Sequence, residues 1–155
     1  MLVDGAFAHD LVYEAALASV PAAVARQLHA EIAAFLAARH CPPARLARHW
    51  ASAGRWAEAG TAWRQAATGA RDAARPVEQA ALLAEAAQAH ARAGQHAGRF
   101  DALLERAAVL TAIDPGAKAL DAVAELASLA QDDEQRLAAL QSRLDLDIAR
   151  HETAQ

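Results

Sequence analysis

The stretch Leu46–Ala67, LARHWASAGRWAEAGTAWRQAA, decides the fold of this chain. Bulky and small apolar residues recur every three or four positions on both sides of Gly54, which is the spacing of an apolar face on an α-helix. A glycine at the end of such a run is typical of a helix C-terminus. The stretch therefore predicts two helices joined by a short turn and packed as a hairpin.

The composition of the whole chain favours helices throughout. Alanine accounts for 48 of the 155 residues, whereas there are only 7 valines, 3 isoleucines and 4 threonines. Alanine loses no side-chain entropy in a helix, while β-branched residues lose rotamer freedom there. We therefore expect an all-α fold, and a chain of this length suits a single domain that buries about 70% of its unfolded surface.

Glycines, prolines and capping residues divide the chain into about eight expected helices. The breaks fall at Pro21, Cys41–Pro43, Gly54, Arg75–Pro76 and Gly94, with later breaks at the Asp114–Gly116 turn and near Gln131. The expected helices cover about residues 11–19, 21–39, 43–53, 56–73, 77–93, 96–113 and 118–130, with the last from 132 onward. In the second of them, one stripe is expected to be buried: Val24, Leu28, Ile32, Phe35 and Leu36.

Residues 40–73 resemble a tetratricopeptide repeat. Residues 77–113 resemble a degraded copy, and residues 117–152 match it by helix number alone. The resemblance implies a right-handed array of stacked antiparallel hairpins over residues 1–155, with an N-terminal helix pair in residues 1–39. The interval from Gly54 to Gly94 is longer than a strict repeat, which has about 34 residues. The matching positions are Trp50, Gly54, Trp56, Ala59, Trp63 and Ala66.

A second resemblance lies near the N-terminus. The segments Phe7–Ala15 (FAHDLVYEA) and Arg26–Ala33 (RQLHAEIA) are similar to a region of large bacterial signalling ATPases, which include transcriptional regulators. In those proteins the region follows the nucleotide-binding module and leads into helical repeats. The resemblance implies a relay region whose partners include other domains of a longer parent chain. No phosphate loop or helix-turn-helix is apparent in the sequence, so the resemblance does not imply that these residues bind ATP or DNA.

Charge and cysteine content limit the partners and the compartment. The formal net charge is −4 and the pI about 5.9, which argues against direct nucleic-acid binding because such binding needs a clustered basic surface. The single Cys41 fits a reducing compartment. No apolar run approaches the length of a membrane span, which needs at least about 18 residues. We expect a soluble, cytoplasmic protein without a membrane partner.

We expect no enzymatic activity and no cofactor. The sequence offers no carboxylate pair, nucleophile–base set or phosphate loop. His40, Cys41 and His49 suggest zinc, but a zinc site needs four ligands and no second pair is evident, so we expect no metal. We interpret His9 as a histidine that bonds the backbone, and His29 as a core or boundary residue.

The expected function is protein–protein interaction and signal relay. Four polar side chains could face a concave groove and hold acidic peptide ends: Arg48, Arg64, Gln88 and Arg92. The competing interpretation of these four is a solvated charged face. Trp50, Trp56 and Trp63 fall at packing positions of the repeat, so we expect them in the core rather than on a ligand. Two alternative functions remain: a small-molecule-sensing helical domain, and a free-standing, self-associating adaptor.

The last expected helix carries a stripe of large apolar residues. These residues are Leu137, Leu140, Leu144 and Ile148. They either cap the end of the array, which stacked repeats require, or form the seam of a homodimer. Capping is the preferred interpretation.

Overall fold

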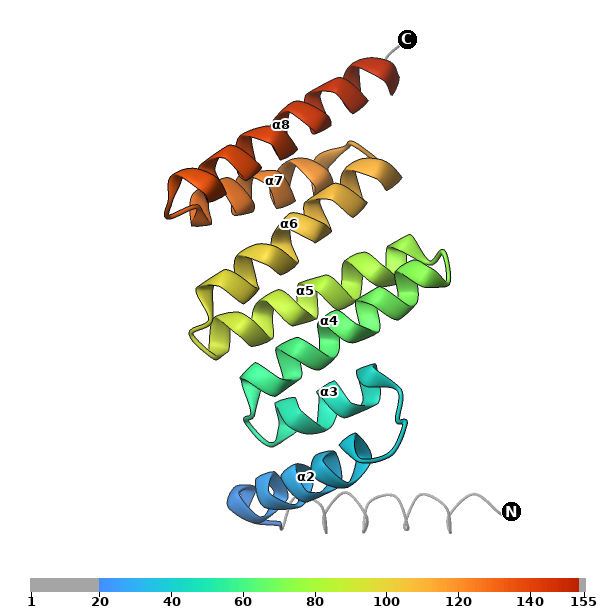
Figure 1. Ribbon diagram of the computed structural model, residues 1–155, viewed down its shortest axis with the longest axis vertical. Coiled ribbons are helices and arrows are strands. Elements are labelled where there is room, and N and C mark those ends of the chain that lie inside the picture. Colours follow the sequence, from blue (N-terminus) through green and yellow to red (C-terminus); the bar gives the residue numbers. More distant parts are fainter. Residues whose placement is uncertain (1–19, 154–155) are drawn as a thin grey trace, which may run out of the picture.

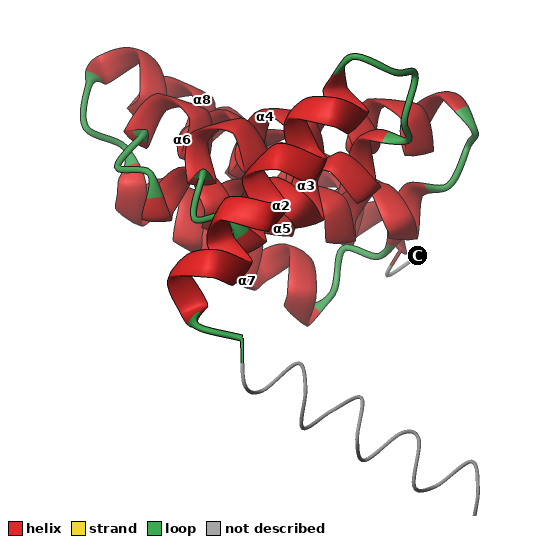
Figure 2. Cartoon of the chain, turned by 90° about the horizontal axis from the view of Figure 1, so that it is seen from below, coloured by secondary structure: helices red, strands yellow, loops and turns green. Residues whose placement is uncertain are grey.

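The computed structural model describes residues 20–153, and this part of the chain forms seven α-helices without any strand (Figures 1 and 2). The expected all-α fold is confirmed there, and the helix bounds lie close to the expected ones. The helix expected at 11–19 lies outside the described residues. The helices are α2 (Ala22–Ala37), α3 (Pro43–Ser52), α4 (Trp56–Asp72), α5 (Pro76–Arg92), α6 (His96–Ile113), α7 (Ala117–Leu129) and α8 (Asp133–Thr153).

The helices form an elongated stack with α2 at one end and α8 at the other (Figure 1). Each helix packs against the next one in the chain, and α8 also packs against α6. One cluster of buried side chains runs from α3 to α8. Between residues 20 and 153, no helix is both long and apolar enough to cross a membrane.

Three consecutive loops have the same geometry and recur at equal intervals along the chain. Their middle residues are Gly54, Ala74 and Gly94, with φ of +76°, +54° and +69°. In each loop the next amide donates to a carbonyl of the preceding helix, at 2.9 Å from N to O, which is the Schellman ending of a helix. The break expected near Arg75 is therefore confirmed, although its left-handed residue is an alanine.

Small residues let neighbouring helices approach closely around His90. This histidine of α5 is 6% exposed, and its ring lies against Gly60 of α4 and Gly98 of α6. A Cβ atom on either glycine would lie within 3.0 Å of the ring, so both positions need glycine for this packing. The ring nitrogen Nδ1 pairs with Oε1 of Gln95 at 2.7 Å, while Nε2 has no partner among the described atoms.

The face of α2 that was expected to be buried is half exposed. Its large residues Val24, Leu28, Ile32 and Phe35 are 41–56% exposed, and Ala33 is the buried residue of this helix. Leu36, the fifth residue of the expected stripe, is partly buried. The prediction was wrong because helical periodicity identifies an apolar stripe but not the element that covers it. On α6, by contrast, Phe100, Leu103 and Ala107 form a buried face.

The left-handed alanine gives a test of the loop geometry. Alanine in the left-handed region is strained by about 1–2 kcal/mol relative to glycine. Replacing alanine by glycine also increases the entropy of the unfolded chain, which lowers the stability by about 0.4–1 kcal/mol. We expect Ala74→Gly to raise the free energy of unfolding by about 0.5–1 kcal/mol in urea denaturation. Gly94→Ala should lower the free energy of unfolding by a similar amount, because it places an L-residue in the left-handed region. No steric clash adds to this cost, since nothing lies within 4 Å of the added Cβ.

A matched control separates this effect from a general effect of glycine. Ala81 is exposed within α5, so Ala81→Gly should lower the stability by about 1 kcal/mol. If Ala74→Gly lowers the stability as Ala81→Gly does, the left-handed loop conformation is wrong.

Candidate functional site

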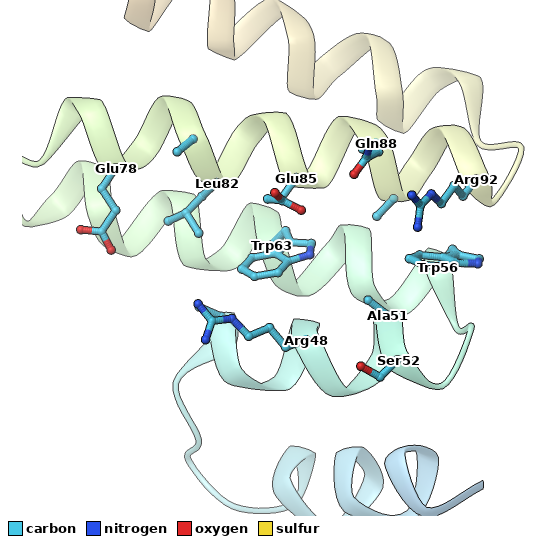
Figure 3. Close-up of a pocket in the computed structure, with 13 residues that line it drawn as sticks. Arg48, Ala51, Ser52, Trp56, Trp63, Glu78, Leu82, Glu85, Gln88 and Arg92 are labelled. Carbon is cyan, nitrogen blue, oxygen red and sulfur yellow. The ribbon is translucent and has the colours of Figure 1, made fainter. Parts of the chain in front are cut away.

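A groove of about 840 Å³ lies between α3 and α5, with residues of α4 at its base (Figure 3). Trp63 of α4 and Leu82 of α5 both line the groove. Trp63 is buried, and Leu82 is partly buried against the core. Residues of α5 enter the groove at intervals of three or four positions, as one face of a helix requires. The polar residues that line it are Arg48, Ser52, Glu78, Glu85, Gln88 and Arg92.

The groove carries two cationic side chains without an ionic partner. Arg48 and Arg92 make no ion pair within residues 20–153, whereas Glu78 is bound by Arg75 at 2.8 Å. The guanidinium of Arg92 lies 4.4 Å from the ring centroid of Trp56, a cation–π contact. Arg48 and Arg92 lie towards opposite ends of the groove, with Trp63 between them (Figure 3). Glu85 lies between the two arginines beside Trp63 and also makes no ion pair within residues 20–153 (Figure 3). The arrangement therefore suits a ligand with negative charge at two places and, between them, an apolar group and a hydrogen-bond donor.

The structure brings together three of the four side chains expected in one groove. Arg48, Gln88 and Arg92 line it, but Arg64 does not. Arg64 follows Trp63 on α4 and therefore points about 100° away from it around the helix. It lies instead beside α6, where it pairs with Asp101 at 3.4 Å and with Glu105.

Sequence reasoning missed the acidic and apolar part of the groove. Glu78, Leu82 and Glu85 were not selected, although they lie three or four residues apart along the same face of α5 as Gln88. A second hollow of about 350 Å³ shares Gln88 and continues across α5 towards α6 and α7. At its far side Arg99 pairs with Glu125 at 3.2 Å. The concave surface is therefore longer than the groove between α3 and α5.

The tryptophans were expected in the core. Trp63 is 8% exposed, which confirms that prediction for this residue. Trp50 and Trp56 are only partly buried against the core cluster. Trp56 and Trp63 also line the groove. These two side chains therefore both pack against the core and form part of the groove surface.

Two histidines form a contact between neighbouring helices. Nδ1 of His29 on α2 lies 3.0 Å from Nδ1 of His49 on α3, so one ring must donate and the other accept. His29 is thus a bonded boundary residue, as expected. Among the described residues no group of three or more His, Cys, Asp or Glu side chains could hold a metal ion. His9 lies outside the described range.

Comparison of the chain with protein-family models, with curated proteins and with solved structures finds no significant match. The similarity of Phe7–Ala15 and Arg26–Ala33 to signalling ATPases stays a prediction from sequence.

The contact between the two histidines gives a pH-dependent stability. Partial burial lowers the pKa of His49 below its usual 6.5, and the nearby His29 and Arg45 lower it further. The unfolded chain then binds more protons than the folded chain between pH 6.5 and the lowered value. We expect the stability from this contact to be present above pH 6.5 and to be lost as the pH falls below it.

Urea denaturation between about pH 7.5 and pH 5 measures this dependence. His49→Gln should flatten the loss of stability on acidification, because the titrating group is gone. His40→Gln, at an exposed site in the turn after α2, serves as the control and should leave the loss unchanged. An identical pH dependence in the wild type and His49→Gln would exclude the proposed role of this contact.

Proposed function

We propose that this chain is a protein-interaction domain without catalytic activity, and that the groove between α3 and α5 binds a segment of a partner protein. The observation that carries the proposal is the groove itself. It is an open surface with tryptophans at its base and two arginines that form no ion pair within the described part of the chain. Aromatic residues and arginine are the side chains that contribute most to protein interfaces.

We further propose that the hairpins stack in a tetratricopeptide-like manner. Two features support this: α3 and α5 are the first helices of consecutive hairpins, and both line the same groove. The equal spacing of the loops at Gly54, Ala74 and Gly94 makes each hairpin somewhat longer than the usual repeat of about 34 residues. Concave surfaces of stacked hairpins are common sites for extended or helical peptides.

The chemistry of the groove favours a segment with acidic and apolar residues. Carboxylates of the partner would pair with Arg48 and Arg92, and such charge-assisted hydrogen bonds are about twice as strong as neutral ones. An apolar side chain between them would pack on Trp63 and Leu82. Glu85 lies in the same groove and would accept a hydrogen bond from the partner's backbone or from a hydroxyl group.

Three short fluorescein-labelled peptides of equal length test this proposal. They share one pattern of leucines and carry aspartate, glutamine or lysine at the remaining positions, and binding is followed by fluorescence anisotropy. We expect the aspartate peptide to bind most tightly. The double variant Arg48→Glu/Arg92→Glu should weaken its binding at least about tenfold, or about 1.4 kcal/mol, because each charge-assisted bond contributes more than this.

Arg26→Glu/Arg71→Glu is the matched control, because it reverses the same number of charges. Arg26 of α2 and Arg71 of α4 are exposed arginines outside the groove, so their reversal tests the effect of net charge alone. If the lysine peptide binds as well as the aspartate peptide, or if Arg48→Glu/Arg92→Glu binds like Arg26→Glu/Arg71→Glu, the groove is not an acidic-peptide site.

We also propose that the domain relays a signal within a bacterial transcriptional or signal-transduction regulator. The support is the sequence similarity of Phe7–Ala15 and Arg26–Ala33 to signalling ATPases. The genomic reading frame around this segment tests the proposal. We expect an in-frame phosphate loop upstream, or an in-frame DNA-binding or cyclase module. A reading frame that contains none of these three modules would contradict the proposal that the domain relays a signal within one chain. The domain would then be a free-standing adaptor.

A further inference from the structure

The outer face of α8 is the most exposed apolar surface among the described helices. Its large residues are 49–67% exposed and are spaced by three, four and four positions, so they form one stripe along the helix. At about 1.5 Å per residue the stripe is about 16 Å long. It is made of Leu137, Leu140, Leu144 and Ile148.

This stripe does not cap the stack, contrary to the preferred interpretation of the sequence. Ala139 and Leu146, on the other side of α8, are the buried residues that face α6 and α7. The stripe therefore points away from the rest of the described chain. Exposed contiguous apolar patches on this scale commonly mark an interaction surface.

An apolar groove lies beside the stripe. It has a volume of about 370 Å³ and is lined by Val123, Ala127 and other small residues of α7 together with Leu140 of α8. Arg136 and Arg143 line its polar side. Such a groove accepts side chains from a facing helix as knobs between two neighbouring helices.

The charges of α8 indicate which helix faces it. Asp133 and Glu134 lie in the first turn with Arg136, and Arg150 and His151 lie in the last turn with Glu152. Two copies of this helix that run antiparallel would keep the two acidic pairs apart and place each at the end of the partner that carries Arg150 and His151. A parallel pair would bring all four of these carboxylates together at one end.

We infer that α8 pairs antiparallel with α8 of a second copy of this chain, so that the protein forms a twofold-symmetric dimer. Such a self-complementary contact closes after two copies. In the register that aligns the stripes, Leu140 faces the partner's Leu144. The same register brings Asp133 close to the partner's His151 and Arg136 close to the partner's Asp147.

Sedimentation equilibrium of the full chain over a wide range of micromolar concentrations tests the inference. We expect a concentration-dependent dimer. The variant Leu140→Glu/Leu144→Glu should weaken dimerisation at least about thirtyfold, as loss of central apolar contacts does. Both residues are exposed in the single chain, so circular dichroism should show unchanged helix content.

The matched control is Val77→Glu on α5, which removes an apolar side chain that is 71% exposed away from α8. It should dimerise like the wild type. A protein that is monomeric at every concentration overturns the inference. A dimer that survives in Leu140→Glu/Leu144→Glu also overturns it, because another face such as that of α2 would then hold the copies together.

Cysteine crosslinking tests the direction of the pair in a Cys41→Ser background, which removes the native thiol. Gln141→Cys lies near the expected twofold axis and should form a disulfide between copies under mild oxidation. Glu134→Cys lies far from its counterpart in an antiparallel pair and should not. Equal crosslinking at both positions would show a parallel pair and overturn the antiparallel arrangement.

Discussion

The left-handed residue in the middle of each short loop is the constraint on which the arrangement of α3 to α6 depends. It ends one helix through the Schellman bonds, and the next helix begins almost at once, so the chain must reverse each time. Because the loops recur at Gly54, Ala74 and Gly94, every second helix returns to the same side of the stack. This is why α3 and α5 line one groove although α4 separates them in sequence.

Small side chains allow the consecutive antiparallel helices to pack closely. The buried residues between α3 and α8 are mostly alanines, and larger side chains such as Leu83, Leu126 and Leu146 fill the spaces between them. Around His90 the packing is closest, since the imidazole occupies the space that a Cβ of Gly60 or Gly98 would need. Tight packing of this kind fixes the relative positions of α4, α5 and α6, and with them the base of the groove.

Much of this fold was predictable from local signals, because glycine and proline mark helix ends directly. Ala74 was not predictable as a left-handed residue, since alanine carries no turn signal and adopts φ > 0 only under the constraint of the folded chain. Helical spacing correctly grouped Gln88 with Arg92, which share one face of α5. It could not show that Arg64 faces α6, because that depends on where Asp101 and Glu105 lie in the stack. Contacts between distant segments, such as the pairing of histidines on α2 and α3, were the least predictable, since no single-helix pattern contains the relative position of two helices.

The alanine-rich core also has a thermal consequence. The heat-capacity change of unfolding grows with the apolar area that unfolding exposes, and each buried alanine contributes little of that area. A core of this composition should therefore show a smaller heat-capacity change per residue than one built from leucine and phenylalanine, which scanning calorimetry measures directly. The stability of this protein would then vary gently with temperature, with a shallow maximum and little tendency to unfold in the cold.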